Sequence, residues 1–190
     1  FSMTQSAPKA QISATPLPRE RSELLRLLLR GVEDIAPVIE RNKTASERAR
    51  RLAPEVVEAM RDTGLLMMKS PYEVGGAEIH PVDQMEVVEA VTYLDSAAAW
   101  SMFIAATVTG RALSALSDEA VNELFAGDVF PIMAGSLKPS GSATPVDGGF
   151  RISGQWAWGS GVHHADYVIV PVLKDDKTGV ITAVVPSAHV

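Results

Sequence analysis

Hydrophobic residues recur at helical spacing through the first two thirds of the chain. Up to Gly127 they return every three or four positions, as in Leu24, Leu28 and Val32. An apolar stripe with this period is typical of helices that bury one face against their neighbours. We therefore predict that residues 19–130 form an N-terminal helical bundle domain.

Residues that begin and end helices support this interpretation. Pro54 and Pro81 suit first helical positions, Gly64 suits a helix end, and Ser117 precedes two acids as an N-cap would. The uncharged stretch 96–110 is shorter than the roughly 20 residues that a membrane-spanning helix needs. It is interpreted as a buried core helix.

The pattern changes after Pro131, where short β-prone runs alternate with turns. Turn-forming residues cluster at 147–149 and 175–179. The order of helices followed by strands predicts an α+β fold, in which residues 131–190 form an incomplete antiparallel β domain with an open sheet edge. The predicted strands are 132–137, 150–153, 155–158, 167–173 and 180–185.

Composition narrows the class of protein. The 190 residues carry 17 Lys and Arg against 23 Asp and Glu, and this net charge of −6 argues against nucleic acid or an anionic membrane as a partner. With no cysteine, disulfides and thiolate metal sites are excluded. No leader is recognised, so we expect a cytoplasmic protein, with residues 1–18 as a disordered arm.

The segment 154–161 is the first candidate for chemistry. Alternation along a strand would place Trp156 and Trp158 on one face, and Ser160 follows between two glycines that let a ligand approach the backbone. A planar cofactor could lie against such a surface. The plainer alternative, that both indoles belong to the core, stays open.

Three other patterns carry weaker hypotheses. The small-residue segment 134–143 could bind an anionic or carbonyl-bearing ring through its amides, or be an ordinary strand and turn. His163, His164 and Asp166 could suggest a metal, but neighbours on a strand point to opposite faces, so we expect no metal site. A hydrolase is disfavoured, because Trp158 replaces the first glycine of a nucleophile elbow around Ser160.

Taken in order, several segments resemble the acyl-CoA dehydrogenase superfamily. They are residues 54–60 and 64–66, the Pro-Tyr-Glu-Val-Gly-Gly loop at 71–76, and the stretch 154–160. The resemblance covers about residues 20–185. It implies the α+β fold of that superfamily, with a helical N-terminal domain and a β domain after it.

Within the superfamily, the chain is similar to the oxygenase components of two-component flavin-dependent monooxygenases. The similar segments are Gly135-Ser136, 139–143, 146–154 and 156–161. Dehydrogenases carry a Thr-Glu-Pro signature where this chain has Leu-Lys-Pro at 137–139, which favours the monooxygenases.

The resemblance implies roles for five residues. Gly135 and Ser136 would contact the polar edge of the flavin, and Trp158 would flank its isoalloxazine ring. Ser160 would be the catalytic hydroxyl that hydrogen-bonds near the reactive N5 and C4a atoms. Trp100 and the helix after it would line the substrate pocket.

It also implies the cofactor and partners. Reduced flavin, FMN or FAD, would come from a separate reductase and react with oxygen to hydroxylate a small organic, possibly aromatic, substrate. The family forms homotetramers through a C-terminal helical bundle that we expect these 190 residues to lack, so the chain alone is expected to be inactive. The alternatives are a dehydrogenase acting on acyl-CoA, and a flavin-free scaffold that self-associates through its sheet edge.

Overall fold

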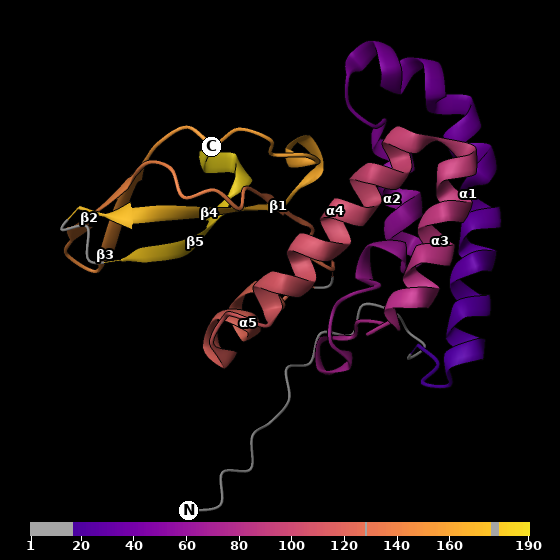
Figure 1. Cartoon of the computed structure of the whole chain (residues 1–190), viewed down its shortest axis with the longest axis horizontal. Coiled ribbons are helices and arrows are strands. Elements are labelled where there is room, and N and C mark those ends of the chain that lie inside the picture. The colour runs from indigo at the N-terminus through magenta and orange to yellow at the C-terminus, as the bar shows by residue number, and fades with distance from the viewer. Residues whose placement is uncertain (1–16, 128, 176–178) are drawn as a thin grey trace, which may run out of the picture.

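The computed structural model describes residues 17–127, 129–175 and 179–190. Within these ranges, helices come first and strands follow, and the two groups lie side by side (Figure 1). The α+β class predicted from the sequence is confirmed. The helices are α1 (Arg21–Ala49), α2 (Pro54–Asp62), α3 (Pro81–Leu94), α4 (Ser96–Leu113) and α5 (Asp118–Leu124).

Local signals in the sequence begin and end these helices as predicted. Pro54 and Pro81 are the first residues of α2 and α3, where the missing N–H removes no helical bond. Ser117 caps α5 by accepting a hydrogen bond from the Ala120 amide at 3.4 Å. Gly64 follows α2 in the left-handed conformation, with φ of 76°, which glycine adopts without strain.

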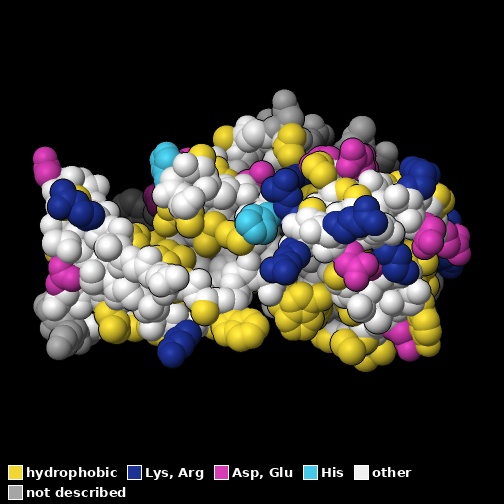
Figure 2. All heavy atoms as spheres, turned by 90° about the horizontal axis from the view of Figure 1, so that it is seen from above, with side chains coloured by type: hydrophobic (Ala, Val, Ile, Leu, Met, Phe, Trp, Pro, Cys, Tyr) yellow, Lys and Arg dark blue, Asp and Glu magenta, His cyan; other side chains and the backbone are white. Residues whose placement is uncertain are grey.

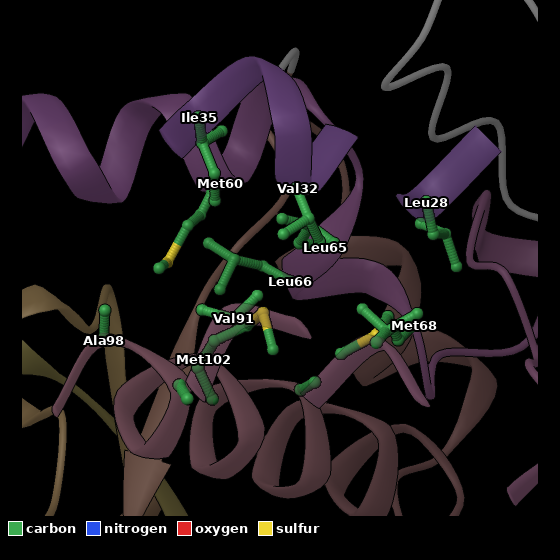
Figure 3. Close-up of a cluster of buried hydrophobic side chains, with 14 of the residues drawn as sticks. Leu28, Val32, Ile35, Met60, Leu65, Leu66, Met68, Val91, Ala98 and Met102 are labelled. Carbon is green, nitrogen blue, oxygen red and sulfur yellow. The ribbon is translucent and has the colours of Figure 1, made fainter. Parts of the chain in front are cut away.

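The predicted apolar stripe forms the main core. Leu24, Leu28 and Val32 face inward from α1 and are at most 5% exposed. Figure 3 shows α1 side chains meeting Met60 of α2 and Met102 of α4 in one cluster. None of the helices in the described ranges is long and apolar enough to cross a bilayer.

The predicted arm, residues 1–18, falls almost entirely outside the described residues. Leu17 is described, and its half-buried side chain packs against the helical core and a second cluster. That second cluster joins α4 and α5 to the first strand and to the central strand of the sheet, through residues that include Leu113, Phe125, Met133 and Ile169.

The sheet is mixed, whereas the sequence predicted an antiparallel one. β4 is the central strand. Along one edge of β4, β1 pairs in parallel with its first residues and β2 pairs in parallel with its last residues, and β5 pairs antiparallel with the other edge of β4. A parallel pair needs a long crossover, which the β2–β3 hairpin and residues 154–166 supply. The strands are β1 (Met133–Gly135), β2 (Ser142–Val146), β3 (Gly149–Ser153), β4 (Tyr167–Lys174) and β5 (Val180–Pro186).

Of the two predicted turns, one connects β2 to β3. Val146 pairs with Gly149, which leaves Asp147 and Gly148 as a two-residue turn, with Gly148 at a φ of 77°. The second predicted turn, 175–179, includes positions 176–178, which lie outside the described residues.

The predicted strand 155–158 does not form. Trp158 has a φ of 64°, which is incompatible with a strand, and the chain stays irregular until a 3₁₀ helix at Val162–His164. Trp156 is half-buried in the core of the sheet, and its indole donates a hydrogen bond to the Pro171 carbonyl at 3.0 Å. Trp158 is 92% exposed, so the expectation of two indoles on one strand face was wrong.

Candidate functional site

The first wall of the candidate site is the outer face of α4. Asp95 begins this helix by accepting a hydrogen bond from the Ala98 amide at 2.8 Å. Ala98 and Met102 bury the inner face, which turns Trp100 outward with 55% of its surface exposed. The Trp100 and Phe103 rings pack with centroids 6.1 Å apart, so the predicted substrate-side tryptophan has an aromatic neighbour.

The second wall is the turn that carries Ser160. Gly161 adopts a φ of 79°, and the Val162 amide donates to the Gly159 carbonyl at 3.0 Å, which closes a tight turn around the serine. The Trp100 indole N–H donates a hydrogen bond to the Ser160 hydroxyl oxygen at 3.2 Å. The structure therefore brings together two of the predicted site residues, one from each half of the chain.

Trp158 lies two residues from this contact and is the most exposed large hydrophobic side chain among the described residues. A left-handed backbone with a bulky side chain is strained, and such strain concentrates at functional sites. Figure 2 shows hydrophobic side chains on both sides of an indentation between the helical and β regions. The exposed Trp158 indole offers a flat apolar face to a ligand.

Gly135 is the last residue of β1 and Ser136 follows it, in a segment separate in sequence from the turn of Ser160. A Cβ at Gly135 would meet the Ile169 carbonyl oxygen at 2.3 Å, so close packing of two strands already requires this glycine. The Ser136 amide donates to the same oxygen at 3.1 Å, and the Ser136 hydroxyl accepts from the Lys138 amide at 3.4 Å. The contacts of this pair thus run to β4 and to its own loop.

The two adjacent histidines lie in a 3₁₀ helix and not on a strand, which corrects the geometry assumed from sequence. His164 is half-buried, and its Nε2 accepts a hydrogen bond from the Leu52 amide at 3.2 Å. Burial, then His163 and Arg51, lower the pKa of His164 below its ordinary value of 6.5. Within the part of the chain that the structure describes, no three His, Asp or Glu side chains gather as metal ligands would.

Sequence reasoning missed the ion pair that joins α2 to the sheet. Arg61 donates to the Phe130 carbonyl and lies 3.5 Å from the Asp166 carboxylate. That carboxylate also accepts from the Ile132 amide at 2.7 Å. Positions 61 and 166 share no sequence pattern, whereas the spacing of Trp100 and Phe103 on one helix was a signal that sequence alone could have used.

Comparison with known families identifies the family to which the chain belongs. The model described as "Acyl-CoA dehydrogenase, N-terminal domain" matches residues 25–129, more than half of the sequence. The chain belongs to this family. Its helical region corresponds to the family's N-terminal domain, as the resemblance implied.

Two relatives of the chain carry the name monooxygenase. The oxygenase subunit HsaA of a flavin-dependent monooxygenase from Mycobacterium tuberculosis is 29% identical, over 79% of this chain and 38% of its own length. Indole-3-acetate monooxygenase from Pseudomonas putida is 30% identical, over 76% of this chain and 36% of its own length. The chain therefore spans less than two fifths of the length of these relatives.

The fold has a solved counterpart. The structure of XiaF from a Streptomyces species, in complex with FADH2 and glycerol, superposes with a TM-score of 0.81 at 24% identity. The match covers 88% of this chain and 43% of the XiaF chain. At this identity the similarity establishes the fold.

Proposed function

We propose that the chain is part of the oxygenase component of a two-component flavin-dependent monooxygenase. The reaction inserts one atom of O2 into a C–H bond of a small aromatic substrate as a hydroxyl group. The second oxygen atom leaves as water, and reduced flavin supplies the two electrons. The names of the relatives and the family membership support this reaction class.

The observation that carries the proposal is the hydrogen bond between Trp100 and Ser160, beside an exposed Trp158. A flavin ring is planar and apolar on its faces and polar along one edge. An exposed indole suits a face, and a hydroxyl between glycines suits the polar edge, so these residues fit the group. Reduced flavin, when bound, supplies the electrons for oxygen activation.

Each side chain then has one task. Trp158 would flank the flavin ring, and Ser160, held in orientation by the Trp100 indole, would hydrogen-bond at its reacting edge. Gly135 and Ser136 would approach the polar edge. The Ser136 hydroxyl accepts from the Lys138 amide, so its proton would be free to donate to a flavin carbonyl. Trp100 and Phe103 form an aromatic wall that would lie on the substrate side.

The remaining assignments follow from the same proposal. FAD is the preferred flavin, since XiaF was solved with FADH2. Indole-3-acetate, the substrate class named for one relative, favours an aromatic substrate. A separate reductase that delivers reduced flavin, a homotetrameric assembly and a cytoplasmic location stay predictions, as does the division into domains near residue 130.

A dehydrogenase that oxidises an acyl-CoA is the second candidate, and the match to the acyl-CoA dehydrogenase N-terminal domain favours it. The two reactions differ in what they do with oxygen. A monooxygenase transfers an atom of O2 to its product, whereas a dehydrogenase passes two electrons to the flavin and forms a double bond in the acyl chain.

The test uses the 190-residue chain and, in parallel, any longer natural form of the protein. Each is supplied with chemically reduced FAD, ¹⁸O2 and a panel of phenols and indoles, and products are analysed by mass spectrometry. One ¹⁸O atom in a hydroxylated product supports the proposal. Reduction of bound FAD by an acyl-CoA, with no labelled product from any aromatic compound, would favour the dehydrogenase instead.

A further inference from the structure

Three side chains within seven residues of the crossover segment contact the helical region or the strand beside it. Ser160 accepts from the Trp100 indole at 3.2 Å, His164 accepts from the Leu52 amide at 3.2 Å, and Asp166 lies 3.5 Å from Arg61. We call residues 160–166 the strap. The strap begins at the proposed site and ends where β4 begins.

We propose that His164 and Asp166 are positioning residues, which anchor the strap so that the Ser160 hydroxyl faces Trp100, and that protonation of His164 releases this hold. The inference deepens the proposed function, on which the role of Ser160 rests. The anchoring itself is a property of the chain without any ligand, and it is tested as such below.

The strap is short and internally bonded, so movement at one end reaches the other. The Val162 amide donates to the Gly159 carbonyl at 3.0 Å, and the His164 amide donates to the Gly161 carbonyl at 2.9 Å. These bonds define one 3₁₀ turn between Ser160 and His164. A shift of the imidazole therefore changes the direction in which the Ser160 hydroxyl is presented.

The anchor at Asp166 is held by several bonds. Its carboxylate accepts from the Ile132 amide at 2.7 Å, its own amide donates to the Ile132 carbonyl at 2.8 Å, and Arg61 adds an ion pair. These bonds fix this end of the strap.

The anchor at His164 is conditional, because a neutral Nε2 must offer its lone pair to the Leu52 N–H. A proton on Nε2 would face that N–H and end the bond. Burial, then His163 on the same turn and Arg51 next to Leu52, lower the pKa of the imidazole, and the Arg61–Asp166 pair lies two positions further along the strap. The bond is therefore present when His164 is neutral and lost in acid.

The indole N–H signal of Trp100 in proton–nitrogen NMR spectra reports the position of Ser160 without any flavin. The signal is assigned with Trp100→Phe and followed in the 190-residue chain from pH 8 to pH 5. We expect it to shift with a midpoint below 6.5, as the lowered pKa of His164 requires. Failure of the signal to move while His164 titrates would overturn the proposal.

Two variants sharpen the test. His164→Gln keeps a neutral acceptor for the Leu52 amide, so the Trp100 signal should stay at its high-pH position throughout. His163→Gln is the matched control: it should keep the pH response of the Trp100 signal, with a midpoint at or above that of the parent chain, because the pKa of His164 is lowered by burial and also by His163. If the Trp100 signal of His164→Gln still moved with pH as in the parent chain, the proposal would be contradicted. If the signals of all variants behaved as expected but the protein had no oxygenase activity, the anchoring would stand and only the proposed function would be overturned.

Discussion

Trp100 and Ser160 lie 60 positions apart and are joined by a hydrogen bond of 3.2 Å from the indole N–H to the hydroxyl oxygen. The donor stands on a helix that is fixed by its buried inner face, and the acceptor stands in a turn between two glycines. The bond fixes which lone pair of Ser160 is occupied and leaves its proton free to act toward a ligand. The proposed site thus depends on contact between the two halves of the chain.

Replacing the hydroxyl tests its role directly. In Ser160→Ala, we expect flavin affinity to stay within about tenfold, or 1.4 kcal/mol, while a smaller share of flavin oxidation yields hydroxylated product. Product formed per flavin oxidised is the measurement. Ser114→Ala, at the exposed end of α4, is the control, and coupling that is equal in both variants would refute the role of Ser160.

The left-handed backbone at Trp158 predicts that replacing this residue affects flavin binding and protein stability differently. Trp158→Glu should weaken flavin binding at least tenfold, because a charge replaces the apolar face. Trp158→Gly should also bind flavin weakly, yet unfold at the same temperature or higher, since glycine relieves a φ of 64°. Calorimetry and flavin titration measure the two effects. A loss of about 3–5 kcal/mol in Trp158→Gly would mean that the indole belongs to the core.

Two methionines on neighbouring helices allow a buried position to be compared with an exposed one. Met102 of α4 is 0% exposed and Met85 of α3 is 64% exposed. Met102→Ala should lower the free energy of unfolding by about 2–5 kcal/mol, whereas Met85→Ala should stay within about 0.5 kcal/mol. Urea unfolding gives both values. Equal losses in the two variants would be inconsistent with the burial of Met102 in the helical core.

Replacing Gly135 tests whether the close packing of β1 against β4 requires a glycine at this position. Gly135→Ala would place a Cβ at 2.3 Å from the Ile169 carbonyl oxygen, so β1 and β4 must separate, with an expected loss of about 1–3 kcal/mol. Gly149→Ala adds a Cβ with nothing within 4 Å and is the control. Thermal unfolding compares them. If Gly135→Ala were as stable as the control, the close pairing of these strands would be wrong.

The ion pair between Arg21 and Asp83 predicts a pH dependence of stability. Hydrogen bonds from Arg21, at 2.7 Å to each carboxylate oxygen, lower the pKa of Asp83 below its ordinary value of 3.8. A lowered carboxyl pKa adds stability above the ordinary value, and this is lost as the pH falls through the lowered pKa. Arg21→Met should therefore be less stable than the parent at pH 7, with a smaller difference near pH 2.

Urea unfolding at both pH values measures that difference. Arg30→Met, which removes an exposed charge from the same helix, controls for the change in net charge. A difference for Arg21→Met that is the same at both pH values would show that the pair does not set the pKa of Asp83.

Local patterns in the sequence predicted the helices well, because their stripes and caps act over a few residues. Pro54, Pro81 and Ser117 stand where such signals place them. The parallel pairing of β1 with β4 was missed, because strand order depends on contacts between residues more than 30 positions apart. Trp158 was misplaced for a local reason, since a left-handed tryptophan contradicts the propensity of that residue.

The candidate site could be predicted in part. Trp100 and Ser160 were both selected, but only the fold puts them in contact. His164 and Asp166 were noticed as a possible metal pattern and instead hold amides of distant segments. Backbone groups have no signature in a sequence, which is why the partners of both side chains could not be foreseen.

The binding of reduced FAD to this surface is the claim on which the account depends most. Anaerobic titration with reduced FAD, followed by tryptophan fluorescence, measures it in the 190-residue chain and in any longer natural form. The account predicts saturable quenching that Trp158→Glu weakens at least tenfold and that Met85→Ala leaves unchanged. Absence of saturable binding in every form, or equal affinity in the parent and Trp158→Glu, would contradict it.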